Sequence, residues 1–245
     1  MVITTTAVAF ILLSLGLGVC GFWFWKAFQK SGGNSKIGIL LSSFIFASSF
    51  QNGIIGLGAL IFSTNPEGLY SILLISQVFL LIHALLGIYV VYYIFFPQKS
   101  SLLAMSVLGS FGLIMIFMTI REYPLGVITP QNSIFWPASF ILSLITFLVL
   151  LVSIGSFFYI FARLFLDSKT KDTRIIALVL SILALGGIVS TFFRFVGTYA
   201  SSENRHLLDI SMGITGLLFI IVLMIIPTIQ KLRNDKSKEI HIKKA

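Results

Sequence analysis

Apolar residues are concentrated in seven long runs, and short polar or basic segments separate them. Each run is 19 to 29 residues long and is apolar on nearly every face of a helix. A membrane-spanning helix needs about 20 such residues, whereas a membrane strand alternates over about 10. We therefore predict an all-α, polytopic membrane protein, a bundle of seven transmembrane helices. The runs are 3–25, 37–62, 69–96, 102–120, 138–166, 175–199 and 207–229.

Turn-forming residues stand between these runs. Asn65-Pro66 and Gly68 precede the third run, and Pro97 follows it. Asparagine, proline and glycine in such clusters favour turns over helix. A 13-residue connection, 125–137, joins the fourth and fifth runs. We divide the chain into a membrane domain, 1–230, and a basic tail, 231–245.

Composition excludes several classes of protein. The chain is 57% hydrophobic and 10% charged, whereas soluble domains are about 45–50% apolar and about 25% charged. A cytosolic enzyme or a nucleic-acid-binding domain does not fit these values. The net charge of +9 is not gathered in one basic domain but lies between the apolar runs, so the partner it predicts is the lipid bilayer.

The distribution of basic residues predicts the orientation. Fourteen Lys and Arg residues fall on the side of the tail, and three, Arg121, Arg194 and Arg205, on the other. Because basic loops remain in the cytoplasm, we expect the N-terminus outside and the C-terminus in the cytoplasm of a cell membrane, the inner membrane if the source is bacterial. The tail would contact anionic headgroups, at about 1 kcal/mol per basic residue. We expect Trp136 in an interfacial aromatic belt.

Two charged residues lie inside predicted spans near the outer end. Arg194 belongs to the sixth run and Asp209 to the first turn of the seventh. Intramembrane charges are costly and are functional candidates, so we expect an ion pair that acts either as a structural staple or as a responsive element. His206 stands one turn before Asp209, and Glu122 follows the fourth run. Together with Arg121, Glu203 and Arg205 on the same outer side, they would form a charged vestibule or ordinary solvated helix ends.

Polar side chains also interrupt the second and third runs. His83 lies near the middle of the third run, either as a hydrogen-bonded interior residue or as a proton-linked switch. Gln51 and Gln77 lie in the outer halves of their runs and line a pocket if they face one interior. The predicted ligand-binding set is Gln51, Gln77, His83, Glu122, Arg194, His206 and Asp209.

The sequence carries no motif for catalysis or metal binding. There is no HExxH or Cys/His cluster and no GxSxG, so neither a zinc site nor a serine nucleophile is expected. We predict no catalytic residue, no metal and no cofactor. The protein is expected not to be an enzyme.

Leu207-Leu208-Asp209-Ile210-Ser211 is similar to the Leu-Asp-x-Ser segment in the last helix of the microbial rhodopsins. The resemblance implies a seven-helix, opsin-like topology with Asp209 in the position of a counterion. In that family the retinal-binding lysine follows four residues later. Gly213 stands there in this chain, and no lysine lies inside a predicted span, so a retinal Schiff base is excluded.

A second resemblance is to the seven-helix sensor modules of bacterial histidine kinases. It rests on Phe135-Trp136 before the fifth run and on the basic loop 169–174 leading into Ile175-Ile176-Ala177-Leu178. This resemblance implies a sensor that signals through a separate partner protein.

These features favour an integral membrane receptor or sensor for signal transduction, which would bind a small ligand, a lipid or a proton in an outer-half polar pocket. Two alternatives stay open. One is a transporter of a small solute or ion, which requires polar groups along the whole depth of the bundle. The other is a structural or assembly subunit of a membrane complex.

Overall fold

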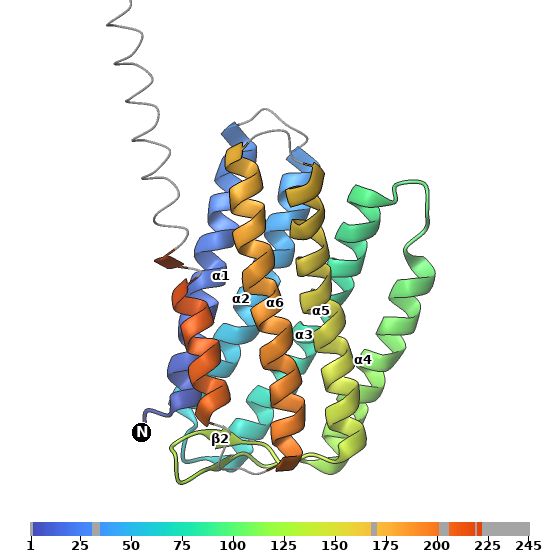
Figure 1. Ribbon diagram of the computed structural model, residues 1–245. Coiled ribbons are helices and arrows are strands. Elements are labelled where there is room, and N and C mark those ends of the chain that lie inside the picture. The colour runs from blue at the N-terminus through green and yellow to red at the C-terminus, as the bar shows by residue number, and fades with distance from the viewer. Residues whose placement is uncertain (1, 31–34, 168–170, 201–205, 219, 222–245) are drawn as a thin grey trace, which may run out of the picture.

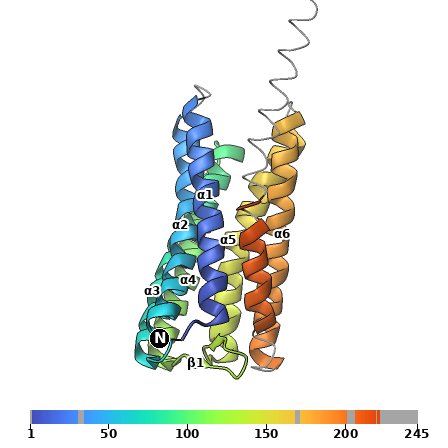
Figure 2. The same ribbon diagram turned by 90° about the vertical axis from the view of Figure 1, so that its left-hand side faces the viewer.

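The computed structural model describes residues 2–30, 35–167, 171–200, 206–218 and 220–221. Seven helices and one short β-hairpin make up this part of the chain, and the helices run side by side as an elongated bundle (Figures 1 and 2). The labelled elements are α1 (Thr5–Lys30), α2 (Ser35–Ile61), α3 (Pro66–Phe95), α4 (Leu102–Glu122), β1 (Val127–Ile128), β2 (Ile134–Phe135), α5 (Phe140–Asp167) and α6 (Lys171–Ala200). The helix His206–Leu218 follows and is called the final helix below.

The all-helical, multi-pass membrane architecture is confirmed. Helices α1 to α5 contain apolar spans of 21 to 30 residues, long and apolar enough to cross a membrane. At 1.5 Å per residue even the shortest matches a hydrocarbon core of about 30 Å. In α6 and the final helix the described apolar stretches are shorter, Ala177–Val189 and His206–Leu218. The tail 231–245 lies outside the described residues.

Residues near the helix ends determine where α3 begins and where α4 ends. Asn65 caps α3, because its side-chain oxygen accepts a hydrogen bond of 3.1 Å from the Gly68 amide, and Pro66 occupies the first turn. Proline suits that position because the first amides of a helix have no partner inside it. Helix α4 ends at Tyr123, which has a left-handed φ of 49°, and Pro124 follows.

Helix α1 is held on two sides by very close backbone contacts. A Cβ atom added to Gly56 of α2 would lie 2.8 Å from the Ile11 nitrogen, and one added to Gly216 of the final helix would lie 2.5 Å from the Leu13 nitrogen. Only glycine permits these approaches, which resemble the small-residue contacts of other membrane helices. The final helix is therefore packed directly against α1.

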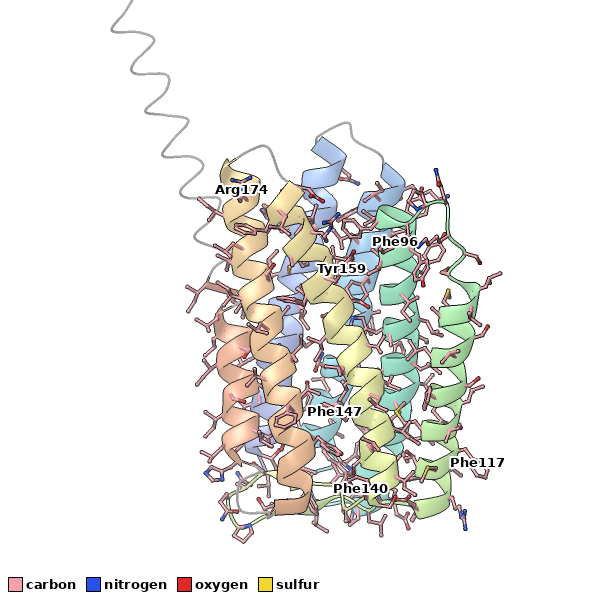
Figure 3. The ribbon with its side chains drawn as sticks, turned by 45° about the vertical axis from the view of Figure 1, so that its right-hand side comes forward. Phe96, Phe117, Phe140, Phe147, Tyr159 and Arg174 are labelled. Atoms are coloured by element: carbon pink, nitrogen blue, oxygen red, sulfur yellow. The ribbon has the colours of Figure 1, made fainter. Side chains whose placement is uncertain are left out.

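Helix α4 lies at the edge of the bundle, where it contacts α3 and α5 (Figure 1). One stripe of α4 is buried, and its centre is Met115. The opposite face carries exposed apolar side chains, including Phe117, which points outward in Figure 3. An apolar surface of this kind is what lipid requires.

A β-hairpin closes one end of the bundle. Residues 125–137, expected only as a connection, contain β1 and β2, which pair antiparallel with Ile128 opposite Ile134. The hairpin is tied to the start of α1: the Thr5 amide donates to the Asn132 carbonyl at 2.8 Å, and Asn132 Nδ2 donates to the Ile3 carbonyl at 2.7 Å. The hairpin thus acts as a clasp on the N-terminal end of α1.

Trp136 belongs to this clasp and not to the bundle surface. We expect Trp136 in an interfacial belt, but its side chain is 8% exposed and its indole Nε1 donates to the Leu69 carbonyl at 3.3 Å. It packs in a buried cluster with Phe10 and Ile134. The hairpin turns the indole inward, which the linear sequence could not indicate.

Candidate functional site

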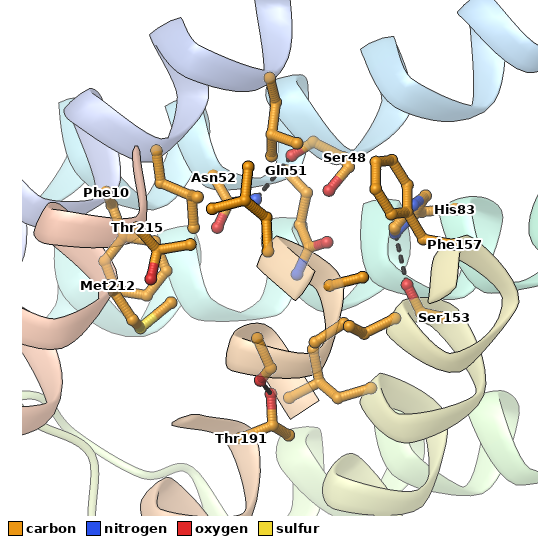
Figure 4. Close-up of a pocket in the computed structure, with 17 residues that line it drawn as sticks. Phe10, Ser48, Gln51, Asn52, His83, Ser153, Phe157, Thr191, Met212 and Thr215 are labelled. Carbon is orange, nitrogen blue, oxygen red and sulfur yellow. Dashed lines mark hydrogen bonds between the residues drawn. The ribbon is translucent and has the colours of Figure 1, made fainter. Parts of the chain in front are cut away.

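A cavity of about 120 Å³ lies in the centre of the bundle (Figure 4). We call it the central cavity. Its walls come from six helices, α1, α2, α3, α5, α6 and the final helix, and α4 contributes none of its described lining residues. The lining residues are Phe10, Leu13, Leu17, Ser48, Gln51, Asn52, His83, Leu150, Ser153, Ile154, Phe157, Leu183, Ala184, Gly187, Thr191, Met212 and Thr215.

Gln51 places a carboxamide in this cavity. It is 7% exposed, and no described residue forms a hydrogen bond with its side chain. Its neighbour Asn52 uses Nδ2 to donate to the Ser48 carbonyl at 2.7 Å. Figure 4 shows these side chains together on the α2 wall, with the Gln51 amide directed inward. Because the Gln51 amide faces the cavity and bonds to no described residue, this wall is suited to a bound polar group.

His83 forms a second polar feature of the cavity. The side chain is 4% exposed, its Nδ1 lies 2.6 Å from Ser153 Oγ, and its ring stacks on Phe44 with centroids 4.5 Å apart. The Nε2 atom has no hydrogen-bond partner among the described residues. Ser153 is one of three serines in the apolar α5, and nothing in the linear sequence marks it as the partner of His83.

The remaining cavity wall is apolar or already hydrogen-bonded. Thr191 Oγ1 donates to the Gly187 carbonyl at 2.8 Å, and Thr215 Oγ1 donates to the Ser211 carbonyl at 2.9 Å. No lysine, arginine, aspartate or glutamate is among the described lining residues. In the described part of the chain, no group of three His, Cys, Asp or Glu residues is placed to hold a metal ion.

A second cavity of about 80 Å³ lies between the central cavity and the hairpin. We call it the hairpin-side cavity, because Phe135 and Trp136 form part of its wall. Leu150 and Thr191 line both cavities, so these two side chains stand at the boundary between them.

Gln77 belongs to the hairpin-side cavity and not to the central one. Its Oε1 accepts a hydrogen bond of 2.6 Å from Thr119 Oγ1, which also donates to the Met115 carbonyl at 2.9 Å. Gln77 and Gln51, expected to share a pocket if they face one interior, therefore line different cavities.

Glu122 has a local role at the end of the bundle. It accepts hydrogen bonds from the Ser139 amide at 2.8 Å and from Ser139 Oγ at 2.5 Å, just before α5 begins. A carboxylate at this position caps the helix and favours its positive N-terminal end.

Asp209 is fully buried where the final helix meets α1, and Thr6 Oγ1 donates a hydrogen bond to its Oδ2. His206 is half-buried one turn earlier. Arg194 belongs to α6, but its side chain lies outside the described residues, so the Arg194–Asp209 ion pair stays a prediction. Asp209 and His206 are absent from the described walls of both cavities.

No protein-family model matches the chain, and no curated protein or solved structure matches it. The fold and the composition define a membrane-embedded, multi-pass helical protein.

Proposed function

We propose that this chain is a seven-helix membrane receptor or sensor without enzymatic activity. It binds a small ligand in the central cavity and signals to a separate membrane or cytoplasmic partner. The observation that carries the proposal is the central cavity itself, since a buried pocket with a few polar groups on an apolar wall is the usual form of a small-molecule site.

The composition of the walls supports a signalling role. Leu183, Ala184 and Thr191 of α6 and Met212 of the final helix line one side of the central cavity. A ligand shifts a conformational equilibrium only through different affinities for the two states. A movement of α6 and the final helix against α2, α3 and α5 would change the shape of the central cavity. A ligand that contacts all of these helices would then bind the two conformations with different affinities.

We further propose that α6 and the final helix are the sixth and seventh spans and that the basic end of the bundle faces the cytoplasm. Basic groups at that end lie over aromatic rings: Lys36 Nζ is 5.2 Å from the centre of the Tyr93 ring, and Lys99 Nζ is 5.6 Å from that of Phe96. Figure 3 shows Phe96, Tyr159 and Arg174 near this same end. Basic and aromatic side chains together are typical of a membrane interface.

Spin-label distances test the coupling without any ligand. In a Cys20→Ser background, Ile39→Cys on α2 and Ile175→Cys on α6 place labels at exposed positions near the basic end. Ala184→Leu fills part of the central cavity and should shift the label distance by about 2 Å, the size of a typical helix displacement. An unchanged distance contradicts the sensor proposal.

Two matched controls accompany this measurement. Ala104→Leu adds the same atoms to α4, outside both cavities, and should leave the distance unchanged. A label pair at Ile39 and Val107 of α4 should respond to neither substitution.

Accessibility labelling tests the orientation. In the same background, an impermeant maleimide added outside intact cells should react with Glu67→Cys and not with Gln98→Cys, both at exposed positions at opposite ends of α3. The reverse pattern contradicts the proposed orientation.

A further inference from the structure

We propose that the central cavity binds a small neutral molecule, mostly apolar, that carries one group able both to donate and to accept hydrogen bonds, such as a primary amide. Gln51 is the residue that recognises this group. The inference rests on the proposed ligand-binding function and specifies the chemistry of the ligand.

The free hydrogen-bonding capacity of the described cavity wall lies on α2, at Gln51, and on α3, where His83 Nε2 has no partner among the described residues. A glutamine side chain offers two N–H donors and one carbonyl acceptor, and the Gln51 carboxamide uses none of them with a described residue. The other amide on this wall, Asn52, is partly used, because its Nδ2 donates to the Ser48 carbonyl. Elsewhere on the wall, the hydroxyls of Thr191 and Thr215 donate to carbonyls of their own helices.

A complementary group must therefore offer both an acceptor and a donor. The Gln51 nitrogen needs an acceptor, and its oxygen needs a donor. A primary amide satisfies both with two parallel hydrogen bonds, and a hydroxyl satisfies them in part.

The rest of the wall selects against charge. The described lining contains no acidic, lysine or arginine side chain, and Phe10, Leu13, Phe157 and Leu183 contribute apolar surface to it. Burying an ionised group without a partner costs far more than burying a neutral amide. Among the described lining side chains His83 alone could carry a positive charge; its Nδ1 is bonded to Ser153, and its Nε2 has no partner among the described residues. A carboxylate analogue is therefore an informative comparison.

The size of the cavity limits the ligand. Its volume is about 120 Å³, whereas an apolar cavity of about 150 Å³ binds benzene. The ligand is thus no larger than benzene, with about six non-hydrogen atoms including its polar group.

The experiment uses 3-fluoropropanamide as the probe, observed by fluorine NMR, with the full chain in lipid nanodiscs. Protein-free nanodiscs give the signal due to partition into lipid. We expect a saturable bound signal only with the protein, and no such signal for 3-fluoropropanoate. Equal or tighter binding of the propanoate, or no saturable binding of the propanamide, overturns the inference.

Gln51→Met and Gln77→Met are the matched variants, since both remove a buried glutamine amide but from different cavities. We expect Gln51→Met to weaken 3-fluoropropanamide binding at least tenfold and Gln77→Met to change it less than twofold. Equal affinity in the wild type and in Gln51→Met contradicts the assignment of Gln51.

Ala184→Leu provides a second variant that does not alter the amide, and it should exclude the probe by filling the cavity. If Gln51→Met does not fold, retained saturable binding in Ala184→Leu overturns the inference. The sensor proposal fails on a different result, an unchanged spin-label distance in Ala184→Leu, so the two failures are distinguishable.

Discussion

The Thr6 hydroxyl joins Asp209 to the rest of the bundle. Thr6 Oγ1 donates to Asp209 Oδ2 and accepts a hydrogen bond of 2.8 Å from the Ile134 amide. One buried hydroxyl near the start of α1 therefore connects the final helix with strand β2. Asp209 thus has a structural partner that its sequence neighbours do not reveal.

Thr6→Val should destabilise the bundle by about 2 kcal/mol, because it leaves a buried amide without an acceptor and removes a donor from the Asp209 carboxyl group. Unfolding by sodium dodecyl sulfate in mixed micelles measures the change. Thr6→Ser should retain most of the stability. Thr5→Val is the control, since the Thr5 hydroxyl makes no hydrogen bond with a described residue. An equal loss in Thr5→Val contradicts the role of Thr6.

Gly216→Ala should separate the final helix from α1. The added Cβ would lie 2.5 Å from the Leu13 nitrogen, and forced overpacking of this kind costs about 1–3 kcal/mol. Gly155→Ala in α5 is the control, because no atom lies within 4 Å of its added Cβ. That control should be neutral, or stabilising by about 0.5–1 kcal/mol through the higher helix propensity of alanine. The same unfolding assay compares the two, and equal effects would argue against close packing of the final helix on α1.

Ser153→Ala should lower the stability of the protein, because His83 loses its hydrogen-bond partner. The substitution leaves the buried Nδ1 atom without the hydrogen bond of 2.6 Å that it has to Ser153, at a cost of about 1–3 kcal/mol. Ser156→Ala serves for comparison, since the Ser156 hydroxyl donates to the Val152 carbonyl of its own helix. Such back-bonds contribute little to stability. A larger loss in Ser156→Ala than in Ser153→Ala would refute this expectation.

Leu150→Ala should connect the two cavities, because Leu150 lines both. We expect a loss of about 2 kcal/mol in stability together with binding of a larger neutral amide, 4-fluorobenzamide, measured by fluorine NMR. Leu151→Ala removes the same atoms from the next residue, which lines neither cavity, and should not admit the larger amide. Unchanged selectivity in Leu150→Ala would mean that Leu150 is not a barrier.

The sequence predicts the helices well because the membrane imposes a simple length and polarity requirement on them. The start of α3 at Pro66 lies three residues before the apolar run, since Asn65 and Pro66 form a capped first turn that is polar. Pro97 and Pro124 stand just beyond the ends of α3 and α4, where a helix cannot continue through proline.

The candidate site is less visible in the sequence. Gln51 and His83 are polar residues inside apolar runs, a pattern that indicates candidate site residues, and both line the central cavity. Ser153 and Thr6 do not, because a serine or threonine inside a membrane helix usually donates to its own backbone. Their partners come from distant elements, and only the packed bundle defines them.

The hydrogen bonds of the Thr6 hydroxyl also have a consequence for the order of assembly during synthesis. The partners of this hydroxyl belong to residues 134 and 209, so the start of α1 stays incomplete until the ribosome has made the final helix. The contacts of Thr6 with the hairpin and with the final helix can therefore form only late in synthesis. The N-terminal end of α1 is thus among the first segments to be made and among the later ones to acquire its buried hydrogen bonds.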